Sequence, residues 1–339
     1  MGWLGNDACY VIAEAGLNHN GSLFNAKRLI DGAVLAGADA VKFQKRSVDD
    51  LAVAEILDAA DSRFPSLGST YREIRNTLEF TESEYFELKI YAEDRGLNFM
   101  VTPFDIKAFQ SLKAVGVSHY KLASHSLTNL PLLEEVASQA ERVVLSTGMS
   151  TLDEIDRAVL ILRGGNIDFA LMHCVSAYPT PVADCNLAMV DVLTKRYDCP
   201  VGYSGHEIGY LPTLAAVARG SQLVERHFTL CNNMEGFDHK MSLRVDQFIE
   251  MVRAIRDVES SIGSGQKAVS DIEQITRNKY HVSAVSKRKI RAGEPLSEDL
   301  VQFKNPGTGL SPASMKNIYG LKALSDIEKD TIIKRSDFG

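Results

Sequence analysis

The sequence predicts an α/β fold: a (β/α)8 TIM barrel followed by a small, mostly β module. Three observations support this prediction. Short apolar runs alternate with amphipathic segments eight times over about 260 residues, nearly every apolar run stops on a polar side chain, and the pattern changes character after Gly263. We therefore expect a barrel domain over residues 1–264, a linker over 265–281 and a second domain over 282–339.

Each predicted strand ends in a chemically useful side chain. The first strand is Cys9–Ala13, and the second is Ala40–Gln44, in which Lys42 and Gln44 share a face because side chains alternate along a strand. The eight strands end at or near Glu14, Gln44, Thr102, Lys121, Ser146, His173, Ser204 and His227. In a barrel of this kind the carboxyl ends of the strands meet at one rim, where the chemistry takes place.

The amphipathic segments between the strands carry typical helix ends. A helix over Leu23–Ala36 is expected to stop at Gly37, and two capping boxes, Thr81-Glu-Ser-Glu84 and Thr151-Leu-Asp-Glu154, open helices that run to about Arg95 and Arg163. The other predicted helices are Ile106–Val115, Leu130–Ala140, Leu187–Tyr197 and Val245–Ile262.

Two stretches interrupt the alternation. From Arg46 to Phe80 the periodicity weakens, and Phe64–Tyr71 is either an inserted active-site loop or a surface excursion. A polar connector follows Gly263-Ser-Gly265, and the chain beyond it has short β-like runs with Gly and Pro turns. Within this last region Ile290–Leu296 resembles Ile327–Ile333, which suggests a faint internal repeat.

Composition argues against several classes of protein. A net charge of -7 disfavours a nucleic-acid or anionic-membrane partner, so an anionic ligand must be held by a few placed cations. Five cysteines with no CxxC pair suggest neither a disulfide framework nor a zinc ribbon. The sequence shows no signal-peptide pattern at its N-terminus and no run of about 18 apolar residues. We expect a cytoplasmic protein.

Two strand ends carry histidines. Val201–Glu207 and Leu223–Thr229 are separated by about one helix, so they should be neighbouring strands with His206 and His227 at the same rim. Two neutral imidazoles in that position suit a divalent metal with open coordination positions. A lone histidine at a strand end is more often structural, and the argument for a site comes from the residues expected around them: Glu14, Lys42, Thr102, Lys121, Ser124, Ser146, Ser204 and Glu225.

Two lysines at the rim indicate the charge of the ligand. Lys42 and Lys121 are costly to bury without a counter-charge, which an anionic substrate would supply. Serine hydroxyls and nearby backbone N–H groups would complete a phosphate or carboxylate cradle. Structural alternatives stay open, because Lys121 can instead pair with Glu225, and Ser124 or Ser146 can cap a helix.

Seven segments in the right order resemble the sialic acid synthase family (N-acetylneuraminate synthase, NeuB type). They are Glu14–Ser22, Lys42–Gln44, Ser146–Met149, His173–Pro179, Gly202–Glu207, Glu225–Thr229 and Asp238–Ser242. The resemblance covers almost the whole chain, including a C-terminal antifreeze-like (SAF) domain. It implies a transferase that condenses phosphoenolpyruvate with an open-chain N-acetylmannosamine-type aldose. Phosphate would leave by C–O cleavage, and the product would be a nine-carbon 2-keto acid.

The resemblance also implies roles for individual residues. His206 and His227 would bind Mn2+ or Mg2+, and Glu14 would act as the acid/base. The residues implied to hold phosphoenolpyruvate are Lys42, Thr102, Lys121, Ser124, Ser146, Ser176 and Ser204. Ser176 stands where bacterial relatives often carry Asn, and its hydroxyl would contact the phosphate.

The implied sugar contacts include one departure from the family. Tyr178 and Asp238 match positions that contact the sugar, and the SAF domain is expected to cover the partner's site in a domain-swapped homodimer. Asn305 stands where many bacterial members carry an Arg that contacts the N-acetyl group. An amide cannot replace the guanidinium fork, so the identity of the acceptor stays open.

Two alternatives remain at this level. The first is a synthase for a related sugar, such as legionaminic, pseudaminic or another surface-polysaccharide nonulosonate, whose acceptor specificity should depend on Ser66–Tyr71 and on Asn305. The second is a non-catalytic carbohydrate-binding protein, which predicts sugar affinity independent of metal and of phosphoenolpyruvate. The combination of Glu14, two histidines and two lysines argues against the second.

Overall fold

The computed structural model describes residues 8–339, which form two compact units that divide between Gly263 and Ser264. The N-terminal residues considered above for a targeting signal lie outside the described part. Within residues 8–339, no helix combines the length and apolar character that a membrane span requires.

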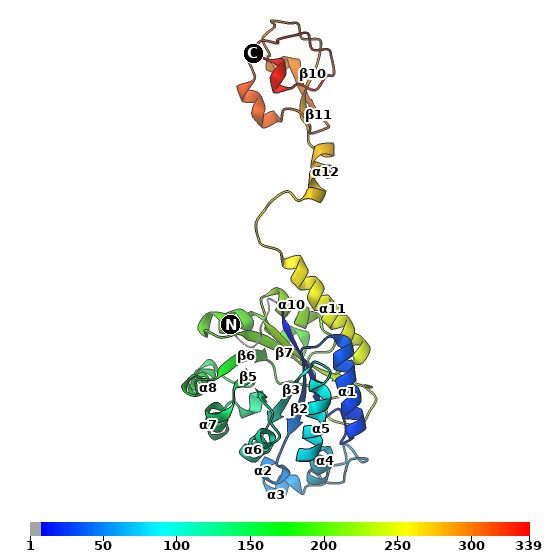
Figure 1. The fold of residues 1–339 in the computed structure, drawn as a ribbon, viewed down its shortest axis with the longest axis vertical. Helices are drawn as coiled ribbons and strands as arrows, with labels where there is room; N and C mark the ends of the chain where they lie inside the picture. Colours follow the sequence, from blue (N-terminus) through cyan, green and yellow to red (C-terminus); the bar gives the residue numbers. More distant parts are fainter. Residues whose placement is uncertain (1–7) are drawn as a thin grey trace. The chain divides into compact units, whose positions relative to one another are not determined.

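The first unit is a closed barrel of eight parallel strands, which confirms the predicted fold class (Figure 1). Neighbouring strands pair in chain order and β1 closes the ring against β8, while a short β9, Leu243–Arg244, extends from β8. The barrel strands are β1 Tyr10–Gly16, β2 Ala40–Lys45, β3 Asn98–Pro103, β4 His119–Leu122, β5 Arg142–Ser146, β6 Asp168–Cys174, β7 Val201–Gly205 and β8 Leu223–Thr229.

Helices surround this barrel in Figure 1 and cover its outer face. They are α1 Leu23–Ala36, α5 Glu82–Glu93, α6 Ile106–Ala114, α7 Leu130–Gln139, α8 Leu152–Gly164, α9 Ala188–Arg196, α10 Leu211–Ala218 and α11 Val245–Ile262. Both predicted capping boxes are present, with Thr81 and Glu84 opening α5 and Thr151 and Glu154 opening α8. Gly37 ends α1 in the left-handed conformation, with φ of 73°, as its position predicts.

Strand periodicity decides which side chains enter the barrel. Along β8, Leu223 belongs to the apolar cluster inside the barrel, whereas Val224 and Phe228 pack in the cluster between strands and helices. Because side chains alternate, Glu225 and His227 share the inner face with Leu223. On β1 the same alternation directs Glu14 inward, in register with His227 of β8 and Lys42 of β2.

The stretch between β2 and β3 is more ordered than the sequence indicates. It contains three helices, α2 Val48–Leu51, α3 Ala54–Leu57 and α4 Tyr71–Leu78. None of the three was predicted. The helix α4 has only eight residues, and its buried face consists of Ile74 and Leu78, one turn apart, which is too short a pattern to stand out in the sequence. Leu67 of the preceding loop packs on those two residues and on Leu17, which anchors the loop against the barrel.

The second unit begins with a helix and continues as a small β module. Within the predicted linker the structure forms α12, Asp271–Tyr280, which Ser270 caps. Strands β10 Ser283–Ser286 and β11 Val301–Lys304 pair antiparallel, and short 3-10 helices lie at Glu298–Leu300, Pro312–Asn317 and Arg335–Asp337. The two similar segments of the sequence pair with each other, because Ile290 and Ile327 exchange both backbone hydrogen bonds at 2.9 and 2.8 Å.

Candidate functional site

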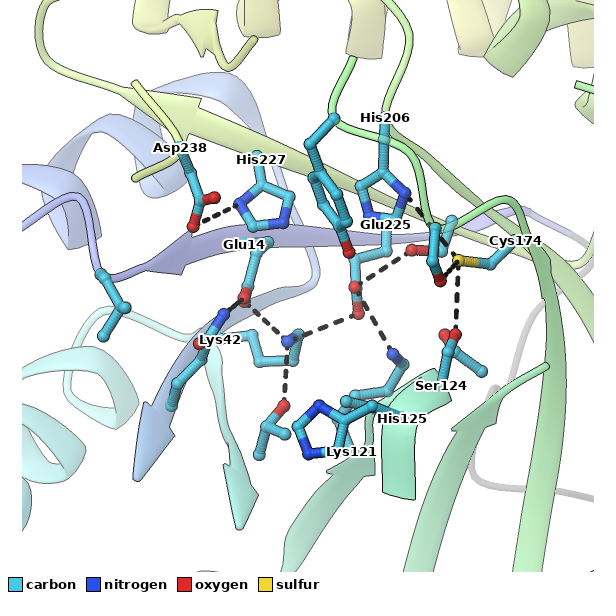
Figure 2. Close-up of a pocket in the computed structure, with 18 of the residues that line it drawn as sticks. Glu14, Lys42, Lys121, Ser124, His125, Cys174, His206, Glu225, His227 and Asp238 are labelled. Atoms are coloured by element: carbon cyan, nitrogen blue, oxygen red, sulfur yellow. Dashed lines mark hydrogen bonds and ion pairs between the residues drawn. The ribbon is translucent and has the colours of Figure 1, made fainter. Parts of the chain in front are cut away.

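A cavity of about 290 Å³ opens at the carboxyl ends of the barrel strands. Its wall brings together these predicted site residues: Glu14, Lys42, Thr102, Lys121, Ser124, Ser146, Ser176, Tyr178, Ser204, His206, His227 and Asp238. Figure 2 shows the acidic, basic and imidazole side chains among them pointing toward one another. Asn305 belongs to the second unit, where its side-chain amide donates to the carbonyl oxygen of Tyr280 at 2.9 Å, so its contact with a sugar stays a prediction.

Lys42 lies at the centre of one half of the cavity. Its ammonium nitrogen is 2.8 Å from Glu14 Oε2 and donates to Thr102 Oγ1 at 3.0 Å. The amide of Gln44 donates to the other oxygen of Glu14 at 2.6 Å. Glu14 is therefore held by one hydrogen bond, from Gln44, and by the charge of Lys42, while its Oε2 makes no hydrogen bond within the described residues. This carboxylate is fixed at a point where it can exchange a proton with a bound molecule.

Lys121 and Glu225 form the second charged pair. The Lys121 ammonium is 3.5 Å from Glu225 Oε1, which also accepts from the Ser204 hydroxyl at 3.2 Å, so the alternative pairing considered for Lys121 is realised. Burial raises the pKa of Glu225, but the charges of Lys121 and Lys42 more than offset this and hold the pKa well below its usual range. Burial lowers the pKa of Lys121. Lys42 lies 3.8 Å from the same carboxylate, so the two lysines share one counter-charge.

The two histidines lie side by side on β8 and just after β7. Their ring centroids are 5.6 Å apart, and the Tyr178 ring lies 4.3 Å from that of His206. The backbone carbonyl of Val175 lies 2.9 Å from His206 Nδ1, which places the proton on that nitrogen and leaves Nε2 with a free lone pair. His227 Nδ1 is buried, has no hydrogen-bond partner within residues 8–339, and lies 3.8 Å from a carboxylate oxygen of Asp238.

This arrangement fits a divalent metal in an open site. A ring nitrogen fixed by a backbone carbonyl is the usual support for a metal-binding histidine, and an unsatisfied buried imidazole nitrogen next to it is otherwise unexplained. Across residues 8–339, no group of three or more His, Cys, Asp or Glu side chains is placed to hold a metal. Two protein nitrogens would therefore leave most coordination positions to water and substrate.

Hydroxyl and thiol groups line the floor between the lysines and histidines. The Ser124 hydroxyl donates to Cys174 Sγ at 3.4 Å and accepts from the backbone N–H of Gly148 at 3.0 Å. Ser146 Oγ is buried and has no hydrogen-bond partner in the described part of the chain. A Cβ on Gly148 would lie 2.5 Å from the Ser176 hydroxyl, so only glycine leaves room for these groups. The result is a cluster of donors suited to a phosphate or carboxylate.

Several cavity residues were missed in the sequence. Cys174 lies in the middle of the hydroxyl cluster. Burial is the largest single influence on its thiol and raises the pKa. Hydrogen bonding and charge from His206, together with Ser124 and Lys121, outweigh burial, so the pKa is lowered. The outer part of the cavity is lined by Arg46, Arg75, Phe104, His125 and Phe237. One feature of the sequence could have indicated Arg46. It follows Gln44 by two positions, so in an extended segment the two side chains lie on the same face.

Comparison with known proteins extends these observations. Residues 29–267 match the NeuB family and residues 281–339 match the SAF domain. An uncharacterized protein of Methanocaldococcus jannaschii is 42% identical over 329 residues, covering 97% of this chain and 94% of its own length. The N-acetylneuraminate-9-phosphate synthase of Mus musculus is 36% identical over 338 residues, covering 98% of this chain and 94% of its own length.

Two further relatives are bacterial. The N,N'-diacetyllegionaminic acid synthase of Legionella pneumophila is 35% identical over 332 residues, covering 96% of this chain and 93% of the relative. The crystal structure of the N-acetylneuraminic acid synthetase from Leptospira borgpetersenii, in complex with citrate, superposes with a TM-score of 0.70 at 33% identity. That alignment covers 80% of this chain and 91% of the other.

Proposed function

The chain belongs to the NeuB family, and from this premise we propose that it is a nonulosonic acid synthase. It condenses phosphoenolpyruvate with an open-chain N-acylated amino sugar of the N-acetylmannosamine type and releases phosphate. Relatives named as synthases of N-acetylneuraminate 9-phosphate and of N,N'-diacetyllegionaminic acid differ in their products, so related acceptor sugars remain the alternative to N-acetylmannosamine itself.

The observation that carries this proposal is the pair of buried lysines facing two histidines in one cavity. Lys42 and Lys121 are each only 3% exposed, and the hydroxyls of Thr102, Ser124 and Ser146 line the same wall. Phosphoenolpyruvate carries a carboxylate and a phosphate, and two cations with several hydroxyl donors match both groups. Ser176 and Ser204 line the cavity next to these donors and complete the set proposed for phosphoenolpyruvate.

The reaction joins two carbon atoms and then removes phosphate. C3 of phosphoenolpyruvate attacks the aldehyde carbon, and the aldehyde oxygen gains a proton and becomes a hydroxyl. Water adds to C2 and loses one proton, and the resulting adduct breaks its C2–O bond to phosphate while the new hydroxyl gives its proton to the departing phosphate and becomes the ketone. Glu14, fixed by Lys42 and Gln44, is the group we assign to move the proton of the water. The lysines and hydroxyls orient phosphoenolpyruvate against the aldehyde.

A divalent cation, Mn2+ or Mg2+, held by His206 and His227, would supply Lewis-acid polarisation of the aldehyde carbonyl. Tyr178 and Asp238 border these histidines and are assigned to the sugar hydroxyls. Asn305 is assigned to the sugar in a homodimer in which the SAF domain of one copy covers the cavity of the other. Sedimentation equilibrium of the full chain tests the dimer.

The proposal is tested by phosphate release from phosphoenolpyruvate with Mn2+ and a panel of acceptors. The panel contains N-acetylmannosamine, its 6-phosphate, mannose and the diacetamido-dideoxy hexoses. We expect release with one acceptor class and loss of release with EDTA. If folded, metal-loaded protein releases no phosphate with any of them, the synthase assignment fails.

A further inference from the structure

The outer end of the cavity carries a cluster of arginines that the proposed chemistry does not use. Arg46 and Arg75 line the cavity, and both also line an adjoining hollow whose wall contains Arg63. The two spaces share Phe104 and Phe237 as well, so they adjoin, and we refer to them together as the recess. We call Arg46, Arg63 and Arg75 the arginine cluster.

Arg75 is the member that makes no hydrogen bond and no ion pair within residues 8–339. It lies on α4, with its guanidinium 4.2 Å from the ring centroid of Phe237 and 4.8 Å from that of Tyr71. Its Nε and Nη1 atoms are buried and make no hydrogen bond, and it forms no ion pair with any carboxylate in residues 8–339. Leaving buried N–H groups of a cation without an acceptor costs free energy, which indicates that a ligand normally supplies the acceptor.

Arg46 presents a second unsatisfied donor to the same recess. Its Nη2 donates to Gln44 Oε1 at 2.6 Å, which fixes the guanidinium, and the group stacks 3.7 Å from the centroid of Phe104. Among the residues that the structure describes, its buried Nη1 has no hydrogen-bond partner, and the carboxylate oxygen of Glu79 that it faces is 3.9 Å away. Burial, followed by the charge of Arg75, lowers the pKa of Arg46 to about 10, so it remains a cation at neutral pH.

The local charges do not balance. The cluster and its ion-pair partners comprise four cations (Lys45, Arg46, Arg63 and Arg75) and two carboxylates (Asp61, paired with Arg63, and Glu79, paired with Lys45 and Arg46). The difference is a net charge of +2. A phosphate monoester brings about two negative charges and three acceptor oxygens, and guanidinium groups bind it through paired N–H donors.

The position of the cluster relative to the reacting groups identifies which part of a substrate it meets. Asp238 borders His227, and the next residue, Phe237, supports the guanidiniums of Arg75 and Arg63. One loop therefore runs from the proposed aldehyde end to the arginine cluster. The pair Lys42 and Lys121, already assigned to phosphoenolpyruvate, has its own carboxylates in Glu14 and Glu225.

We propose that the arginine cluster binds a phosphate group on the acceptor, at the end of the sugar remote from the aldehyde. The acceptor is then an N-acylated amino hexose phosphate, and Arg46, Arg63 and Arg75 determine that specificity. This inference rests on the proposed synthase function. A neutral hydroxymethyl group at the same place would leave the net charge and the free donors uncompensated.

The test compares kcat/KM for N-acetylmannosamine and for its 6-phosphate in the full chain. We expect the phosphorylated acceptor to be preferred by about 100-fold, and Arg75→Gln to reduce that preference by about 10- to 100-fold. Arg75→Lys keeps the charge but loses the paired N–H donors of the guanidinium. Its preference for the phosphorylated acceptor should lie between that of the unmodified chain and that of Arg75→Gln. Arg72→Gln is the matched control, because Arg72 lies on the same helix, pairs with Asp49 and Asp58 and lines neither space, so the preference should be unchanged.

A binding measurement separates failure of the subsite from failure of the function. Calorimetry of the full chain with N-acetylmannosamine 6-phosphate, inorganic phosphate and glucuronate, without phosphoenolpyruvate, should show the sugar phosphate binding most tightly and Arg75→Gln weakening it. If no acceptor supports turnover but this Arg75-dependent binding is found, the phosphate subsite is supported and the proposed synthase function fails. Equal or better turnover with the unphosphorylated acceptor, tighter binding of glucuronate, or an unchanged preference in Arg75→Gln would overturn the subsite.

Discussion

Arg226 donates hydrogen bonds to both the carboxylate and the backbone carbonyl oxygen of Glu207, and both side chains are fully buried. Each is the sequence neighbour of a proposed metal ligand, His227 and His206. Because side chains alternate along β8, the pair lies on the outer side of the barrel wall while the histidines face the cavity. This ion pair adds a side-chain link between the end of β7 and β8, whose backbones pair up to Gly205 and Arg226, directly beside the two imidazoles.

Breaking this pair should destabilise the barrel strongly. Arg226→Met leaves the Glu207 carboxylate buried beside the hydroxyls of Tyr203 and Thr213 alone, and an uncompensated buried charge costs about 3–5 kcal/mol. Urea unfolding followed by circular dichroism measures the loss. The double variant Arg226→Met, Glu207→Gln removes both charges and should regain most of it. A single variant as stable as the unmodified chain would show that the pair contributes nothing.

Replacing Glu14 by Gln should lower kcat by about 10²- to 10⁴-fold, the range for removal of a general acid or base. The amide is nearly isosteric, but it leaves Glu225, 3.8 Å away, as the remaining counter-charge of Lys42, so some loss of stability should accompany the loss of kcat. Thr102→Val serves as the comparison, because it removes only the hydroxyl that accepts from Lys42 and should raise KM for phosphoenolpyruvate more than it lowers kcat. A Glu14→Gln protein with undiminished kcat would remove this carboxylate from the proton transfer.

Most of the inner site could be predicted because it lies on strands. Lys42, Glu225 and His227 sit in apolar runs with a period of two, so their face and their rim follow from the pattern and from barrel geometry. The resemblance to a known family then supplied roles that periodicity could not.

The outer site depends on contacts that no local pattern records. Arg75 faces the recess because α4 is anchored through Leu67 to Leu17, and because Phe237, far away in the sequence, lies under its guanidinium. The buried pair Arg226 and Glu207 was also beyond prediction, since charged residues on the helix-facing side of a strand are expected only when their partner is known.

Both His206→Ala and His227→Ala should weaken Mn2+ binding by about 100-fold or more, because each removes one of two protein nitrogens. Paramagnetic resonance of free Mn2+ measures this without turnover. His281→Gln, an exposed residue of the second unit, is the matched control and should bind as the unmodified chain does. In the assay, a chelator should abolish phosphate release and added Mn2+ should restore it. Activity retained by His206→Ala in the presence of chelator would contradict the metal site.

His19 should make the barrel less stable as the pH falls. Burial lowers the pKa of His19 to about 3, so the folded state keeps the ring neutral, stacked 4.3 Å from Phe80 and accepting from the N–H of Gly21. The unfolded chain binds a proton near pH 6.5, and the folded chain does not until about pH 3. Between these values the unfolded state holds one more proton, so the free energy of unfolding falls by about 1.4 kcal/mol for each pH unit of acidification.

The variant His19→Asn isolates this contribution, because the amide oxygen can accept the same N–H and does not titrate. Its free energy of unfolding should be lower than that of the unmodified chain at pH 7, since the stacking on Phe80 is lost, and the gap should narrow steadily below pH 6.5. His281→Asn removes an exposed imidazole and should follow the unmodified chain at every pH. Parallel pH profiles for His19→Asn and the unmodified chain would mean that folding does not change the pKa of His19, and the lowered pKa would have to be abandoned.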